Sequence, residues 1–81
     1  MRINWRKDDT YAYLLVDVYV AYANVAGRKN WEYAHGCVGY NPRLCRWVVR
    51  SPRVTHTEVV AATKQGAMDV LSRWIEDGIN F

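Results

Sequence analysis

The stretch WEYAHGCVGYNPRLCRWVVR (residues 31–50) decides the fold, because it is typical of two strands joined by a tight turn. Asn41 opens the turn, and Pro42 occupies its second position, where the fixed φ of proline is favourable. With Pro42 and Arg43 at the tip, two faces are predicted, and a slip of one residue would exchange them. One face holds the pairs Tyr40–Cys45, Val38–Trp47 and Gly36–Val49, and the other holds Gly39–Arg46, Cys37–Val48 and His35–Arg50.

Residues 11–24 (YAYLLVDVYVAYAN) are rich in β-branched and aromatic residues, which favour a strand before the hairpin. The even positions form a continuous apolar face, whereas the odd positions form a mixed face rich in tyrosine. This alternation predicts a sheet with one clearly buried side. The apolar face comprises Ala12, Leu14, Val16, Val18, Val20 and Tyr22.

The last third of the chain predicts a strand followed by a helix. Residues 54–62 (VTHTEVVAA) are expected to form a strand, with a helix beginning at Thr57 as the alternative. Thr63 is suited to cap a helix over residues 64–77, and Gly78 is suited to end it. The apolar residues of this helix recur at three- and four-residue steps. They are Ala67, Met68, Leu71, Trp74 and Ile75.

The element order predicts an α+β fold in a single domain spanning residues 1–81. We expect an antiparallel sheet of three to four strands with one C-terminal helix packed on one face, in the order β-β-β-β-α. One helix covers only one face of a sheet. The opposite face is then left without a second layer, unless the N-terminal segment MRINW folds back over it. The face expected beneath the helix comprises Leu14, Val16, Val18, Val38, Tyr40, Trp47 and Val49.

Charge is distributed unevenly along the 81 residues, although the net charge is only +3. Residues 28–53 carry six basic side chains and one acidic one, Glu32, and residues 54–81 carry an excess of acidic side chains. A basic middle can indicate an anionic partner, and it can equally protect an exposed hairpin edge from aggregation. The hydrophobic share of 51% excludes an intrinsically disordered chain.

The first residues resemble a signal peptide, with a basic start, an apolar run and AYA at 21–23. Asp8 and Asp9 stand where positive charge is expected, and Asp17 interrupts the apolar run. The run is also too short to span a membrane. We therefore expect a cytoplasmic protein without membrane association, whose cysteines, Cys37 and Cys45, are free thiols.

The sequence does not favour catalysis, a cofactor or a metal. Two serines and two histidines give no recognisable nucleophile–base arrangement, and no glycine-rich phosphate loop is present. A metal site from His35, Cys37, Cys45 and His56 is disfavoured. The two cysteines are eight residues apart and point to opposite faces in the expected register.

The uncovered face predicts a binding surface. Tyrosine, tryptophan and arginine dominate protein interfaces, which favours a protein partner or a homodimer seam. Aromatic rings interleaved with cations on a sheet also suit single-stranded nucleic acid, which stays the alternative. The residues expected to bind the partner are Tyr11, Tyr13, Tyr19, Trp31, Tyr33, Arg43, Arg46, Arg50 and Arg53.

The run from Gly36 to Trp74 resembles a pattern found in small phage and prophage proteins. It combines a glycine-containing strand, the Trp-Val-Val strand at 47–49, a short strand, and a helix capped by Thr63 with Ala67 near its start. Proteins of this look include anti-CRISPR proteins and inhibitors of host RNA polymerase. The resemblance implies a phage-type inhibitor that binds and blocks a host protein or ribonucleoprotein complex without catalysis. It implies docking through the open face or the basic hairpin at 43–53.

Overall fold

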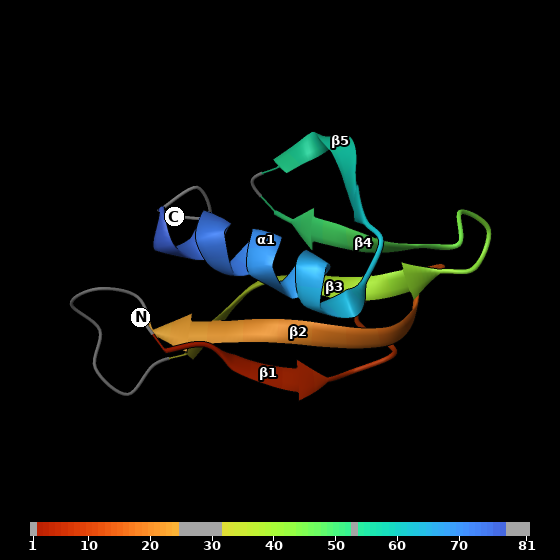
Figure 1. Ribbon diagram of the computed structural model, residues 1–81. Helices are drawn as coiled ribbons and strands as arrows, with labels where there is room; N and C mark the ends of the chain where they lie inside the picture. The colour runs from red at the N-terminus through yellow and green to blue at the C-terminus, as the bar shows by residue number, and fades with distance from the viewer. Residues whose placement is uncertain (1, 25–31, 53, 78–81) are drawn as a thin grey trace.

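In the computed structural model, five strands form one antiparallel sheet and a helix packs across it (Figure 1). The structure describes residues 2–24, 32–52 and 54–77, with residues 32 and 54–57 described by their backbone alone. The strands lie side by side in chain order: β1 (Asn4–Lys7), β2 (Val16–Asn24), β3 (Glu32–Asn41), β4 (Arg46–Ser51) and β5 (Val54–Ala61). Helix α1 (Lys64–Glu76) follows. The α+β class is therefore confirmed, with five strands in place of the expected three to four.

The C-terminal elements match the sequence prediction closely. The Thr63 hydroxyl accepts a hydrogen bond from the amide of Gly66 at 3.0 Å, so the expected N-cap of α1 is confirmed. At the other end, the Asp77 amide donates to the carbonyl of Arg73 at 2.9 Å, and Gly78 lies outside the described residues. Because β5 is extended through residue 61, the alternative helix from Thr57 is wrong.

The N-terminal third differs from the prediction. The strand expected over residues 11–24 begins only at Val16, and residues 8–15 form a connection that we call the cover loop. The N-terminal segment does not fold back over the open face, which was the alternative; it forms an edge strand, since β1 pairs with β2 and places Trp5 opposite Ala21. Trp5 therefore packs on the helix side of the sheet.

The turn between β3 and β4 is two residues longer than expected. Asn41 pairs with Arg46 and Val38 pairs with Val49, so residues 42–45 form the loop. The Asn41 side-chain oxygen accepts hydrogen bonds from the amides of Arg43 at 2.9 Å and Leu44 at 3.3 Å, which stabilises the wider turn. The expected pairing was wrong by two residues. A shift by an even number leaves the side chains of residues 37–41 and 46–50 on their predicted faces.

The helix side of the sheet forms one core. Val38 and Val49 lie there as expected, beneath the fully buried side chains of Leu71 and Ile75. Strand β2 contributes Ala21 and Ala23, whereas the sequence predicted its valines at this position. The prediction for β2 was therefore wrong. Val18 and Val20 are buried instead on the opposite side of the sheet.

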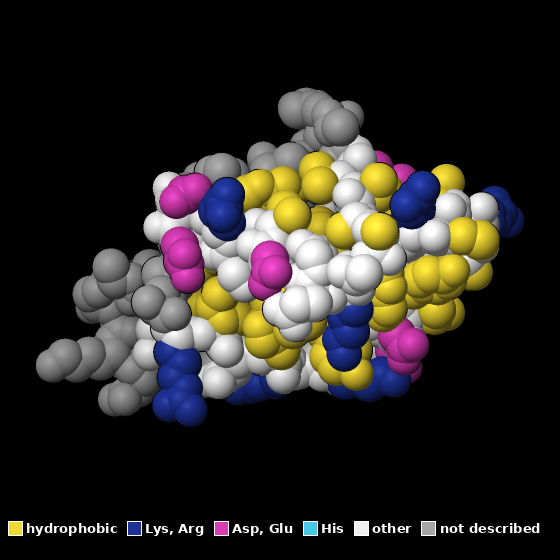
Figure 2. All heavy atoms as spheres, in the orientation of Figure 1, with side chains coloured by type: hydrophobic (Ala, Val, Ile, Leu, Met, Phe, Trp, Pro, Cys, Tyr) yellow, Lys and Arg dark blue, Asp and Glu magenta, His cyan; other side chains and the backbone are white. Residues whose placement is uncertain are grey.

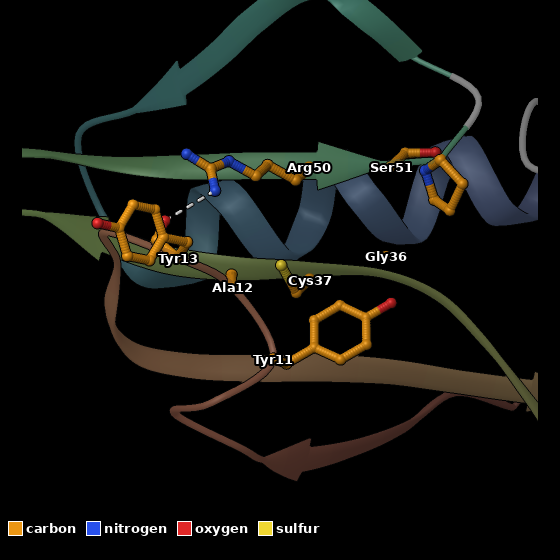
Figure 3. A pocket seen from close by; sticks show the side chains of 8 residues that line it. Tyr11, Ala12, Tyr13, Gly36, Cys37, Arg50 and Ser51 are labelled. Carbon is orange, nitrogen blue, oxygen red and sulfur yellow. Dashed lines mark hydrogen bonds between the residues drawn. The ribbon is translucent and has the colours of Figure 1, made fainter.

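A second core lies on the opposite side of the sheet, and the chain itself covers it. The cover loop lies over β2 and β3 there, whereas α1 lies behind the sheet in the same view (Figure 3). The face expected to lack a second layer is thus partly covered, which corrects the prediction. The buried residues of this second core are Ala12, Leu15, Val18, Val20, Cys37 and Val48.

A bulge in β3 changes which residues share a face. Gly36 pairs with Ala21 while residue 34 pairs with Tyr22, so His35 is an extra residue in the strand. Gly36 has a φ of +141°, and a side chain there would run into the backbone carbonyl of Arg50, so only glycine suits the position. Residues before the bulge therefore have the opposite orientation from the one that simple alternation predicts.

Candidate functional site

The cover loop is fixed by its two aspartates. The Asp8 carboxylate accepts hydrogen bonds from the Thr10 hydroxyl at 2.7 Å and from the Thr10 amide at 3.1 Å. The Asp9 carboxylate accepts one from the Val18 amide at 3.0 Å, which ties the loop to the first residues of β2. Side-chain acceptors of this kind order a segment that has no ladder of its own. The loop is therefore held against the sheet by hydrogen bonds at both of its ends.

The cover loop packs on the sheet through two buried side chains, those of Ala12 and Leu15, which belong to the second core. Gly39 makes room for Leu15, because a methyl group on Gly39 would lie 2.9 Å from the Leu15 Cβ. The glycine therefore permits the close approach of the loop.

The tip of the cover loop, Tyr13 and Leu14, is exposed to solvent. Tyr13 is 83% exposed and Leu14 is 56% exposed. Leu14 also has a φ of +67°, in the left-handed region that leucine rarely adopts. Two apolar side chains thus project from a loop that is otherwise well anchored.

A pocket of about 290 Å³ lies between the cover loop and the end of β4 (Figure 3). The tyrosine ring of Tyr11 stands on one side with its hydroxyl end directed toward the Gly36 end of the pocket. The lining residues come from the loop, from β3 and from the end of β4. They are Tyr11, Ala12, Tyr13, Gly36, Cys37, Arg50, Ser51 and Pro52.

Arg50 connects the pocket to the rest of the face. Its guanidinium donates to the backbone carbonyl of Tyr13 at 3.1 Å, which is the dashed contact in Figure 3. It also forms an ion pair with Glu58 of β5 at 3.4 Å. The carboxylate of Glu58 therefore already balances the positive charge of Arg50, and the hydrogen bond from Arg50 holds the backbone of Tyr13 in place.

Two weakly acidic groups beside the pocket, the Cys37 thiol and the Tyr11 hydroxyl, have raised pKa values. Burial raises the pKa of the Cys37 thiol above its ordinary value, and the nearby charge of Arg50 opposes this only in part. Burial also raises the pKa of the Tyr11 hydroxyl. Neither group supplies an anion near neutral pH, so the thiol lacks the thiolate character that nucleophilic cysteines require.

The structure brings three of the expected partner-binding residues together, namely Tyr11, Tyr13 and Arg50. Arg43 and Arg46 are exposed at the turn between β3 and β4. Trp31 and Arg53 lie outside the described residues.

Two of the expected tyrosines lie on the helix side instead. Tyr19 is half-buried there, with the Lys64 ammonium 3.6 Å from its ring centroid. Tyr33 pairs with Ala23 of the helix-side core, because the bulge at His35 reverses the alternation. Their placement on the open face was therefore wrong. So was the pairing of His35 with Arg50, since Cys37 faces Arg50 and His35 is buried.

Two features were not predicted from the sequence: the exposure of Leu14, and the bulge at His35 that precedes Gly36 in the lining of the pocket. Leu14 was assigned to a buried strand face, and nothing in its neighbours predicts a positive φ. Gly36 offered a weak signal, since a glycine inside a strand often indicates a bulge.

The helix side carries a different surface. Figure 2 shows charged side chains of both signs scattered over it, with hydrophobic side chains gathered at the end where β3 turns into β4. Tyr40 and Trp47 lie at that end in an edge-to-face contact, with their ring centroids 5.5 Å apart.

Among the residues that the structure describes, no group of three or more histidine, cysteine or acidic side chains is placed to hold a metal ion. Within the same residues, no helix has the length and apolar character needed to cross a membrane. Comparisons with protein-family models, with curated proteins and with solved structures found no match for this chain.

Proposed function

We propose that this protein is a non-enzymatic protein-binding module that docks through the tip of its cover loop. The observation that carries the proposal is an exposed leucine in a left-handed conformation, next to a tyrosine that is 83% exposed. A left-handed backbone costs roughly 1–2 kcal/mol for a residue other than glycine. Neither side chain recovers that cost through burial within the chain, and local strain of this kind is concentrated at functional sites.

The anchoring of the loop supports the same function. The contacts of Asp8, Asp9 and Arg50 hold the tip in place before binding. A preordered loop loses little conformational entropy when a partner docks, so more of its contact energy appears as affinity. Tyrosine on such a loop is a favourable anchor, because it offers a large contact area with few rotatable bonds.

Nucleic-acid binding through the same face is the weaker proposal. Cations near the loop already have partners, since Arg50 pairs with Glu58 and Lys7 pairs with Asp9 and Asp17. Backbone phosphates are bound by cations whose charge is available, and the binding weakens as salt rises. Exposed Arg43 and Arg46 are the residues on which this alternative would depend.

The class of partner follows from the resemblance described above. It leads us to propose a phage-type inhibitor that blocks a host protein or ribonucleoprotein complex, as anti-CRISPR proteins and inhibitors of RNA polymerase do. The free thiols of Cys37 and Cys45 support a reducing compartment and hence the cytoplasm.

Affinity capture from bacterial extracts tests the proposal. Immobilised protein should retain a specific host protein in about 0.5 M salt, where phosphate contacts are largely screened. Retention should be lost when Tyr13→Ser and Leu14→Ser are combined. The matched control is Arg73→Ser, an exposed position on α1, on the side of the sheet opposite the cover loop. This variant should retain the same protein. Equal retention by all three proteins would contradict docking through the tip.

Two further measurements separate the alternatives. Sedimentation should show a monomer, and a dimer abolished by the tip substitutions would mean that the partner is a second copy. Fluorescently labelled single-stranded DNA should not bind at low salt. Binding that falls steeply with salt, and that Arg46→Gln weakens, would favour the nucleic-acid alternative.

A further inference from the structure

We propose that the pocket beside the cover loop receives one aromatic side chain of the protein partner. This inference rests on the proposed protein-binding function and specifies what the partner presents. The tip, Tyr13 and Leu14, would touch the partner surface, while a single tryptophan, tyrosine or phenylalanine of the partner enters the pocket.

The size of the pocket limits what it holds. Its volume of about 290 Å³ lies just below the range of roughly 300–1,000 Å³ for small-molecule sites. That space suits one large side chain and is small for a nucleotide cofactor. Because the pocket opens beside the exposed tip, a partner that contacts Tyr13 has surface within reach of the pocket.

The lining favours an aromatic ring over an aliphatic group. The Tyr11 ring forms one wall, and Ala12, Cys37 and Pro52 add apolar surface. Aromatic pairs prefer offset-stacked or edge-to-face contacts, which an upright ring at a pocket wall allows. The guanidinium of Arg50 lies at the edge, where it can contact the face of a bound ring.

Charge disfavours an anionic ligand in the same place. The guanidinium of Arg50 is opposed by Glu58 at 3.4 Å and donates to the Tyr13 carbonyl. A phosphate or carboxylate entering the pocket would meet that nearby carboxylate together with the cation. A neutral ring needs no new counter-charge, and it leaves both contacts of Arg50 intact.

The test uses single-residue probes and amide NMR of the intact protein. N-acetyl-tryptophanamide should shift the amide signals of Gly36, Cys37 and Ser51 in a saturable way. N-acetyl-leucinamide should bind at least threefold more weakly, as expected from the extra energy of an aromatic pair. Adenosine monophosphate and inorganic phosphate should leave these signals unchanged.

Substitutions at Tyr11 provide the matched variants. Tyr11→Phe keeps the ring and should bind the tryptophan probe as the wild type does. Tyr11→Leu keeps apolar bulk without the ring and should bind threefold to tenfold more weakly. Unchanged signals from Ala67 and Leu71 would show that both variants keep the fold.

The outcomes separate this inference from the proposed function. If leucinamide binds as well as tryptophanamide, or if no probe shifts the pocket signals, the aromatic occupant is wrong. Capture of a host protein that depends on Tyr13 and Leu14 would still support the docking tip in that case. Stronger shifts from adenosine monophosphate would overturn the inference in favour of a nucleotide ligand.

Discussion

The two faces of the sheet are covered in different ways. Helix α1 satisfies its own backbone hydrogen bonds and buries Leu71 and Ile75 completely on one face. The cover loop has no such ladder and is held by two backbone hydrogen bonds together with the side chains of Asp8, Asp9 and Arg50. The helix side therefore buries large side chains completely, whereas the loop side leaves Tyr13 and Leu14 exposed.

The largest expected effect comes from truncating one leucine on each face. Leu71→Ala, in the helix-side core, should lower the free energy of unfolding by about 3–5 kcal/mol. Leu15→Ala, in the cover loop, should lower it by about 2–3 kcal/mol, since that site can relax more easily. Urea unfolding followed by circular dichroism measures both values. An equal or larger loss for Leu15→Ala would mean that the loop contributes as much to stability as the helix.

A smaller effect is expected when the loop is pushed away from the sheet. Gly39→Ala brings a methyl group to 2.9 Å from the Leu15 Cβ and should cost about 1–3 kcal/mol. Amide exchange should speed up at Tyr11 and Val18, whose amides bond to the loop, more than at Ala67 in α1. The control, Gly66→Ala in α1, should change stability by less than about 1 kcal/mol. Uniform acceleration at all these amides would argue against a separately seated loop.

The same contrast explains which features the sequence could predict. Helix α1 follows from regular spacing of apolar residues after a threonine cap, and both signals are local. The hairpin faces survived a wrong turn length, because the actual register differs by two residues. Features that depend on short-range chemistry along one element were therefore predictable.

The loop side depended on features that alternation does not reveal. The bulge at His35 reversed the orientation of Tyr33, and β2 directs its alanines rather than its valines into the helix-side core. The segment YAYLL at 11–15 has the composition of a strand, yet the Tyr11 amide donates to the Asp8 carbonyl and the Tyr13 carbonyl accepts from Arg50. Within the candidate site, Tyr11, Tyr13 and Arg50 were predicted, whereas Leu14 and the contribution of Gly36 to the pocket were not.

Alkaline pH should weaken the cover-loop side further. Burial raises the pKa of the Cys37 thiol and of the Tyr11 hydroxyl above their ordinary values. The folded protein thus keeps protons that the unfolded chain releases, so the free energy of unfolding falls as pH rises past about 9. Cys37→Ala should reduce this slope between about pH 9 and 10, because it removes the buried thiol. A slope equal to that of the wild type would contradict the assignment to Cys37.

The smallest stability effect separates strain from function. Leu14 and Cys45 have φ values of +67° and +53°, and glycine would relieve the strain at either position. Relief of roughly 1–2 kcal/mol is partly offset by the added freedom of glycine in the unfolded chain. Both Leu14→Gly and Cys45→Gly should therefore raise the free energy of unfolding by about 0.5 kcal/mol in urea titrations.

Only one of these two variants should lose the partner. Leu14→Gly removes half of the tip and should abolish capture of the host protein, whereas Cys45→Gly should leave capture unchanged. Stabilisation together with loss of binding would mean that the strain at Leu14 is retained for the partner contact. If Leu14→Gly instead destabilised the protein by more than about 1 kcal/mol, the leucine side chain would be packing within the chain. The cover loop would then serve stability as the helix does, and the difference between the two faces would disappear.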